Sequence, residues 1–348
     1  MIGWLATTAL AGQDLTELEL LAGARTAPGA ALEQPSEWEP EPIEPMGVAA
    51  LLARHRHFGA PGWYGLDATV WGVAPEADAT LFALGPRAGL AWSTDTLRGE
   101  VAGRFDGQLY PFVTGTTNGR GELLLRGTWT HDAVEAGLQV EGVDREYVER
   151  TWSFRTIEPG AMLTVGRGLR ATAGVSVQVN QGSQLVGTDT ALVEGTQLRL
   201  TAGLQGSTAH LAAWARYRLV DAWGGGAQAA SRPVFTPVGD YSDDVDALSA
   251  GGFLQHRAEL GASVDRDGWV ISASALGRLR DARVPDLASY RRTGHGQVSV
   301  LRELGETWSA RLTLGCSGAE LASGAGYLDA YGWLGIGWSR EGDRAVRE

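Results

Sequence analysis

The chain contains no lysine, so all 29 of its basic residues are arginine. We attribute this to the codon usage of a GC-rich genome. The 41 Asp and Glu residues outnumber the arginines and give a net charge of −12. Nucleic-acid-binding proteins are usually basic, so we expect no nucleic-acid partner. We expect the negative balance to reside in solvated loops.

Cysteine is almost absent, because Cys316 is the only one. A single cysteine excludes a disulfide within the chain and any site built from several thiolates. Cys316 falls on the apolar face of a predicted strand, where we expect it to act as a small hydrophobic residue. We predict no metal site and no cofactor.

Long apolar runs are also missing. No stretch approaches the roughly 18 apolar residues of a membrane-spanning helix, which excludes a helical membrane protein. Residues 1–12 form a short apolar run that ends in small residues, with no Arg or Lys before it. This run resembles the end of a secretory signal, and we interpret it as a signal-peptide remnant.

What the chain does contain is a regular alternation of apolar and charged residues, clearest between Leu97 and Thr130. Side chains alternate across a β-strand, so such a segment has one apolar and one ionic face. The apolar or glycine positions are Leu97, Gly99, Val101, Gly103, Phe105, Gly107 and Leu109, then Gly121, Leu123, Leu125, Gly127 and Trp129. Each strand runs to about ten residues or more, near the length that crosses a bilayer when tilted.

The same alternation recurs from residue 62 to residue 340 and predicts about 14 strands, an even number. Tight turns near residues 94, 131, 167, 207, 267 and 305 alternate with longer loops near 75, 112, 144, 185, 235, 285 and 320. Five tryptophans fall on the apolar face beside the tight turns: Trp92, Trp129, Trp269, Trp308 and Trp338. Such a row is typical of an aromatic girdle at a membrane interface.

On these features, residues 62–340 resemble the porin-like transmembrane β-barrels of the bacterial outer membrane. The resemblance is architectural and identifies no specific family. It implies an all-β, antiparallel, up-and-down barrel with short periplasmic turns and longer extracellular loops. Both termini and the tryptophan girdle would then lie on the periplasmic side. The partners it implies are outer-membrane lipid and the barrel-assembly machinery.

The cost of burying charge decides which face points inward. An arginine on the lipid face costs roughly 2–4 kcal/mol near the midplane, so the charged face must line the lumen. The predicted lumen-lining residues are Arg87, Arg98, Glu100, Arg104, Asp106, Arg120, Glu122, Arg126, Arg170, Arg199, Arg216, Arg218, Arg257, Glu259, Arg278, Arg280 and Arg311. Two interpretations stay open: cross-strand ion pairs that fill a closed barrel, or a wet pore whose arginine excess favours anions.

The remaining segments lie outside the predicted barrel. Residues 13–61 include the Pro/Glu-rich stretch 36–45, which should be extended. We interpret 13–61 as a loose periplasmic tail, with a plug or a docking segment for a periplasmic secretion partner as the alternative. Residues 341–348 form a charged C-terminal tail.

No enzymatic arrangement is evident. The chain has no Gly-x-Ser-x-Gly motif, and neither His210 nor His295 has a convincing Ser or Asp companion. The acidic run 240–246 lacks the ligand spacing of an EF-hand loop. We therefore predict no catalytic residue.

The sequence thus predicts a non-enzymatic barrel that forms a diffusion pore or export conduit, with anionic solutes or a polysaccharide as candidate cargo. The first alternative is a non-conducting barrel that anchors or docks envelope partners. An outer-membrane hydrolase is the second alternative.

Overall fold

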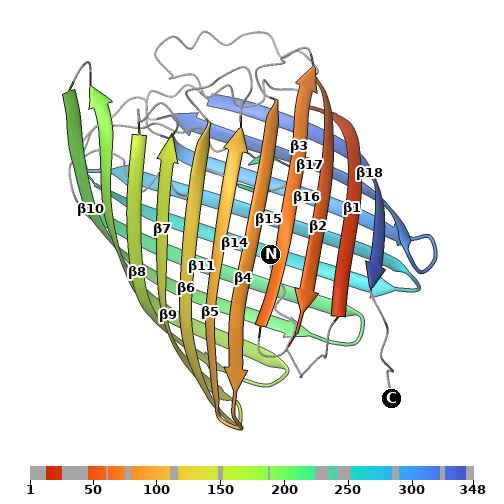
Figure 1. Ribbon diagram of the computed structural model, residues 1–348, viewed down its shortest axis with the longest axis horizontal. Helices are drawn as coiled ribbons and strands as arrows, with labels where there is room; N and C mark the ends of the chain where they lie inside the picture. The colour runs from red at the N-terminus through yellow and green to blue at the C-terminus, as the bar shows by residue number, and fades with distance from the viewer. Residues whose placement is uncertain are drawn as a thin grey trace.

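The computed structural model describes residues 13–25, 46–59, 62–74, 80–109, 117–147, 152–186, 189–223, 235–236, 239–240, 252–283, 290–321 and 326–341. These residues form a closed antiparallel β-barrel of sixteen strands, in which each strand pairs with its neighbours in the chain (Figure 1). The first and last strands, β1 (Gln13–Arg25) and β18 (Gly326–Glu341), pair with each other and close the barrel.

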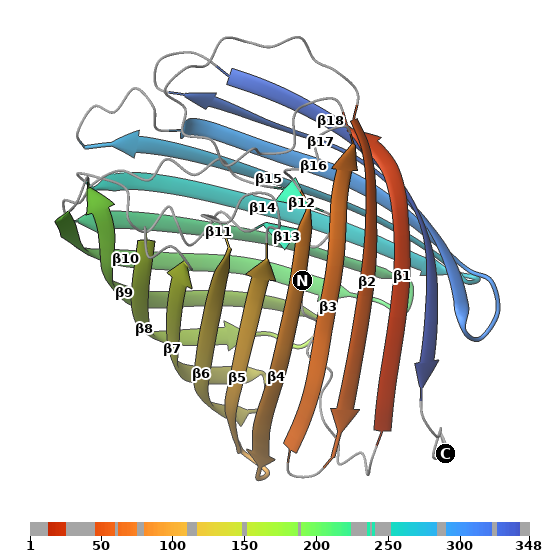
Figure 2. The same cartoon turned by 45° about the horizontal axis from the view of Figure 1, so that its top comes forward.

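The other barrel strands are β2 (Met46–Phe58), β3 (Gly62–Ala74), β4 (Leu81–Ser93), β5 (Leu97–Leu109), β6 (Asn118–His131), β7 (Val134–Tyr147), β8 (Trp152–Val165), β9 (Leu169–Val186), β10 (Asp189–Ser207), β11 (Leu211–Trp223), β14 (Phe253–Arg266), β15 (Trp269–Ala282), β16 (Tyr290–Glu303) and β17 (Trp308–Leu321). Two short strands, β12 (Phe235–Thr236) and β13 (Gly239–Asp240), pair with each other between β11 and β14. Figure 2 draws this small hairpin within the outline of the barrel.

The predicted strand count was wrong by two, because β1 and β2 lie in the segment predicted to be a periplasmic tail. Both strands alternate like the rest: Leu18 and Leu20 are exposed, while Leu21 is buried. A barrel has no free edge, so its first strand must pair with its last. The Pro/Glu-rich stretch, the signal-like residues 1–12 and residues 342–348 lie outside the described residues.

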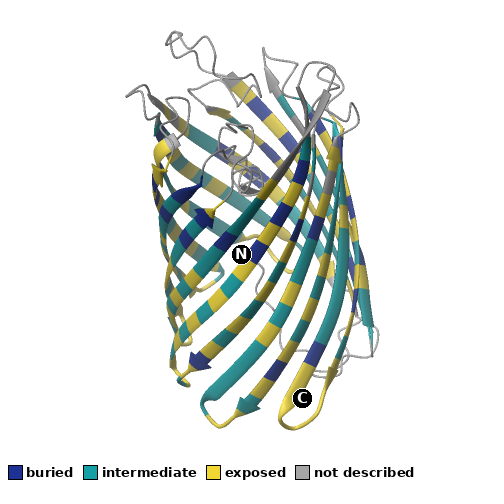
Figure 3. Cartoon of the chain, turned by 90° about the vertical axis from the view of Figure 1, so that its left-hand side faces the viewer, coloured by how far each residue is buried: buried dark blue, intermediate teal, exposed yellow. Residues whose placement is uncertain are grey.

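The outward faces of the strands carry the large apolar side chains. Leu84, Leu125 and Leu260 expose 53%, 42% and 59% of their surfaces, and exposed and less exposed residues alternate along the strands (Figure 3). An apolar surface of this extent is stable only in a membrane. The fold is therefore a transmembrane barrel, as the alternation predicted. Among the described residues, no helix has the length and apolar character to cross a membrane.

The hairpin between β14 and β15 shows how local sequence sets the register. Arg266 pairs with Trp269 across the two residues Asp267 and Gly268, and both have positive φ, 54° and 74°. This is the geometry of a two-residue Asp-Gly hairpin turn, at the place where the sequence predicted a tight turn, and it suits the right-handed twist of the flanking strands.

Several glycines leave room for an aromatic ring on the neighbouring strand. A Cβ at Gly99 would overlap the ring of Trp92, and one at Gly315 would overlap the ring of Tyr331. Part of the high glycine content therefore has a packing role within the barrel wall.

Candidate functional site: the charged inner wall

The predicted lumen-lining residues all lie in barrel strands, on the face opposite the exposed leucines. By strand they are Arg87 on β4; Arg98, Glu100, Arg104 and Asp106 on β5; Arg120, Glu122 and Arg126 on β6; Arg170 on β9; Arg199 on β10; Arg216 and Arg218 on β11; Arg257 and Glu259 on β14; Arg278 and Arg280 on β15; and Arg311 on β17. Most of them belong to two walls, on β1 to β6 and on β11 to β15, and a third cluster lies on β7 to β10.

The first wall is built around Asp67 of β3. Its carboxylate lies 2.6 Å from Nη2 of Arg56 and 3.6 Å from Nε of Arg54, and it also contacts the guanidinium of Arg87. Arg54 in turn lies 2.8 Å from Glu17 of β1. Three arginines from β2 and β4 therefore converge on one acid.

The network continues on β5 and β6. Arg104 contacts Asp106 and lies 3.8 Å from Glu122, which also contacts Arg120. Arg87 and Arg104 stand directly opposite each other in the β4–β5 register, so the two clusters adjoin. In these two clusters five arginines contact four acids, Glu17, Asp67, Asp106 and Glu122, and we call this surface of β1 to β6 the paired wall.

Sequence reasoning missed four residues of the paired wall, namely Glu17, Arg54, Arg56 and Asp67. The first three were missed because their strands were taken for a tail. Asp67 could have been found, because it lies between the apolar residues Leu66 and Ala68 and therefore has inward parity. Glu19 of β1 was missed for the same reason as Glu17, and it lies 3.2 Å from Arg311 of β17.

A third cluster surrounds Arg199 on β10. Its guanidinium lies 2.6 Å from Glu158 of β8 and donates to the side-chain oxygens of Gln178 and Gln197. Glu158 also accepts a 2.5 Å hydrogen bond from Ser176. The register of β8 against β7 runs without a shift through Glu158 and Pro159, so Glu158 shares a face with Glu141. Beside this cluster, Arg170 of β9 lies 2.8 Å from Glu135 of β7.

The second wall, on β11 to β15, has few acids. Arg218 stands opposite Arg257, and Arg257 stands opposite Arg278, so three arginines occupy one level on neighbouring strands. We call these three residues the arginine row. Glu259 contacts Arg257 at 2.6 Å. Like charges directly opposite each other destabilise a sheet, so the fold keeps this row at a cost.

Arg278 and Arg280 contact neutral groups on the neighbouring strands. Arg278 donates to Thr293 at 3.0 Å, and Arg280 donates twice to Gln255 while its guanidinium lies 4.2 Å from the ring centre of Phe253. Both arginines expose only 6% of their surface. Their side chains are therefore packed within the barrel wall and have little contact with water in the lumen. Arg216, by contrast, is exposed and lies 5.3 Å from the ring of Trp214.

Aromatic side chains adjoin the second wall on β16 and β18. Nε2 of His295 lies 2.5 Å from the hydroxyl of Tyr331, whose ring stacks on Trp333 at 5.1 Å between centroids. Trp333 packs with Leu21, Val48 and other buried apolar residues. His210 contacts the backbone carbonyl of Asp265 at 3.0 Å.

The five tryptophans of the predicted girdle lie near the short turns. Trp92, Trp129, Trp269 and Trp308 are 42–57% exposed, and Trp338 stands opposite Trp308 in the β17–β18 register. The first residues of β1 and the last residues of β18 lie at one end of the barrel, because Leu15 pairs with Glu341. The last residues of β2 lie there too, because Gln13 pairs with Phe58.

No protein-family model and no curated protein matches the chain. Among solved structures it is similar to the outer membrane channel DcaP of Acinetobacter baumannii, with 10% identity and a TM-score of 0.49 over 98% of this chain and 100% of that one. An anion-selective porin from Comamonas acidovorans matches with 10% identity and a TM-score of 0.48 over 95% and 99% of the two chains. A bacterial polysaccharide outer membrane secretin matches with 11% identity and a TM-score of 0.46 over 92% and 97%. Likeness at this level does not assign a function.

Proposed function

We propose that the barrel is a diffusion pore in the outer membrane of a Gram-negative bacterium and that it prefers anions. The observation that carries the proposal is the difference between the two walls. On the paired wall, acids offset the arginines almost one for one, whereas the arginine row places three arginines opposite one another on neighbouring strands. A lumen lined by an excess of one charge raises the local concentration of the opposite ion.

The membrane orientation follows from the connections between strands. Outer-membrane barrels have short periplasmic turns and longer extracellular loops. The two-residue turn at Asp267 and Gly268 and the ends of β1 and β18 lie at one end. We propose that this end and both chain ends face the periplasm, and that the exposed tryptophans mark that interface.

The competing proposal is a non-conducting barrel that docks envelope partners. Its support is the burial of Arg278 and Arg280 and the dense pairing on β1 to β6. The docking segment first expected at 13–61 is now reduced, since β1 and β2 belong to the barrel wall. Only residues 26–45 remain for that role, and they lie outside the described residues.

Single-channel recording in a planar bilayer separates these proposals. Purified, refolded protein should give discrete conductance steps, and its heat-modifiable gel migration confirms that the barrel is folded. Folded protein that gives no steps would contradict the pore and favour the docking role.

A further inference from the structure

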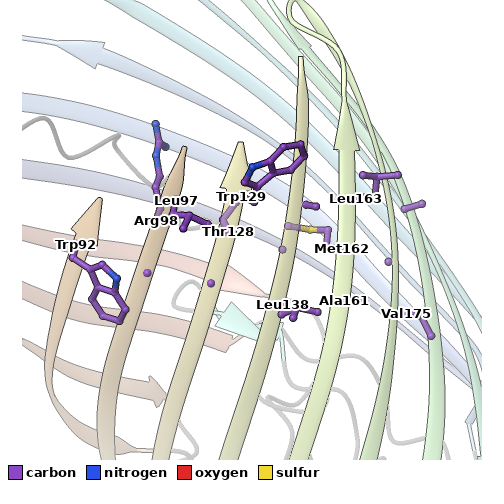
Figure 4. A pocket seen from close by; sticks show the side chains of 16 residues that line it. Trp92, Leu97, Arg98, Thr128, Trp129, Leu138, Ala161, Met162, Leu163 and Val175 are labelled. Atoms are coloured by element: carbon purple, nitrogen blue, oxygen red, sulfur yellow. The ribbon is translucent and has the colours of Figure 1, made fainter. Parts of the chain in front are cut away.

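A concave apolar groove lies on the outer surface of the barrel across β4 to β9, at the short-turn end (Figure 4). Its volume is about 890 Å³, within the range of ligand-binding pockets. Small residues form its floor: Gly99, Gly127, Ala136, Ala161 and Ala173. Larger apolar residues rise around them, namely Trp92, Leu97, Trp129, Leu138, Leu163 and Val175.

The strand registers explain the shape of the groove. Ala136 stands between Trp129 on β6 and Leu163 on β8, while Ala161 stands between Leu138 on β7 and Val175 on β9. Large and small outward residues therefore alternate along and across the strands. Trp92 lies over Gly99, where a Cβ would overlap its ring. The small residues between the large side chains leave a groove on the otherwise convex outer surface.

One charged residue, Arg98, lines this apolar groove. It is the second residue of β5, it is exposed, and it forms no ion pair with any described residue. Figure 4 shows its side chain extending past Leu97 toward the short-turn end. Arg98 has the inward parity of β5, but it is the second residue of the strand, so its long side chain can extend past the rim of the barrel to the headgroup level beside the groove.

We propose that this groove binds one glycerophospholipid, with an acyl chain along the glycine and alanine floor and the phosphate at Arg98. The apolar groove matches the acyl chain of such a lipid, and the cation at its end matches the phosphate. An arginine binds phosphate through charge-assisted hydrogen bonds, and tryptophan N–H groups at a membrane interface suit the polar headgroup region. The proposal rests on the membrane orientation given above, which places the groove in the periplasmic leaflet.

Native mass spectrometry of the full-length protein, titrated with dioleoyl phosphatidylglycerol in detergent, tests the groove. The wild type should retain one lipid. The variant Ala136→Leu/Ala161→Leu fills the floor with side chains that a bilayer tolerates, and it should lose that lipid. The matched variant Ala262→Leu/Ala273→Leu adds the same bulk to an opposed outward pair on β14 and β15 and should retain it. Equal retention by the two variants would overturn the proposal.

The phosphate contact has its own test. Arg98→Gln should weaken phosphatidylglycerol binding roughly tenfold, the effect of losing one charge-assisted hydrogen bond, while Arg266→Gln at an exposed turn should not. Dioleoylglycerol, which lacks the phosphate, should bind the wild type and Arg98→Gln equally weakly. Wild-type binding of dioleoylglycerol as tight as that of phosphatidylglycerol would exclude the role of Arg98.

Conductance keeps this proposal separate from the pore. The groove-filled variant should conduct like the wild type, because its changes face the lipid. A barrel that retains the lipid but never conducts would contradict the pore and leave the groove standing. A barrel that conducts but retains no lipid would contradict the lipid-binding groove and leave the pore proposal standing.

Discussion

Asp67 is the residue on which the paired wall most depends, because three arginines from two strands contact its carboxylate. Removing one partner of such a cluster leaves half-buried charges without compensation. The sequence predicted charged residues on the inner face, yet it could not show that Arg54, Arg56 and Arg87 share one acid. Alternation gives the face a residue occupies, whereas partners depend on the register between strands.

Asp67→Asn should therefore lower the free energy of unfolding by about 2 kcal/mol. Denaturant titration of the protein in lipid vesicles, followed by tryptophan fluorescence, measures this change. Asp265→Asn is the control, since Asp265 is exposed and its side chain pairs with no described residue. An equal, small effect of both substitutions would show that the cluster contributes no stability.

Gly315 tests the packing role of glycine. In Gly315→Ala the added Cβ overlaps the ring of Tyr331 and should disturb the contact between Tyr331 and His295. We expect a loss of about 1–3 kcal/mol, typical of overpacking. Gly277→Ala places the same methyl group in open space and should leave the unfolding midpoint unchanged. If the two substitutions behave alike, the ring does not need the glycine.

At the scale of the strands, the sequence predicted the regular elements well and the first two poorly. From Trp63 onward, alternation and turn signals located each barrel strand, and the Asp267–Gly268 turn has the expected positive φ angles. β1 and β2 were missed because a Pro/Glu-rich stretch separates them, and the whole of residues 13–61 was interpreted as a loose tail. Closure of the barrel, which pairs β1 with β18, is a long-range condition that no local pattern shows.

The membership of β1 in the barrel can be tested with one charge. Leu20 is 57% exposed on the outward face of β1, so Leu20→Arg should cost roughly 2–4 kcal/mol near the bilayer midplane and reduce folding into vesicles. Leu125→Arg on β6 should behave alike, whereas Asp95→Arg in an exposed turn should fold normally. Normal folding of Leu20→Arg would show that residues 13–25 lie outside the barrel wall, as in the periplasmic tail first expected.

β8 shows a subtler limit of sequence reasoning. Apolar residues change parity near Pro159, a pattern that a β-bulge would produce, but the register runs through this point without a shift. Consequently Glu158 faces inward and contacts Arg199. A change in apolar parity thus marked a polar site on the inner wall, and a search for acids of inward parity could have found it.

At the scale of the whole molecule, the charges on the inner surface of the barrel are arranged asymmetrically. The wall on β1 to β6 pairs its arginines with acids, whereas the arginine row on β11 to β15 sets three arginines opposite one another. Sequence composition could not predict this division, because the net charge of −12 has the opposite sign to the proposed lumen. Only the placement of each charge on a strand, and of each strand in the barrel, separates the two walls.

The most direct test of this account is the reversal potential of the pore in a tenfold KCl gradient. The wild type should show a potential of the sign given by chloride preference. Arg218→Gln/Arg257→Gln should move it toward zero, whereas Arg104→Gln/Arg120→Gln, which removes equal charge from the paired wall, should move it less. A wild-type potential of the sign given by potassium preference, or equal shifts in both variants, would contradict the central claim.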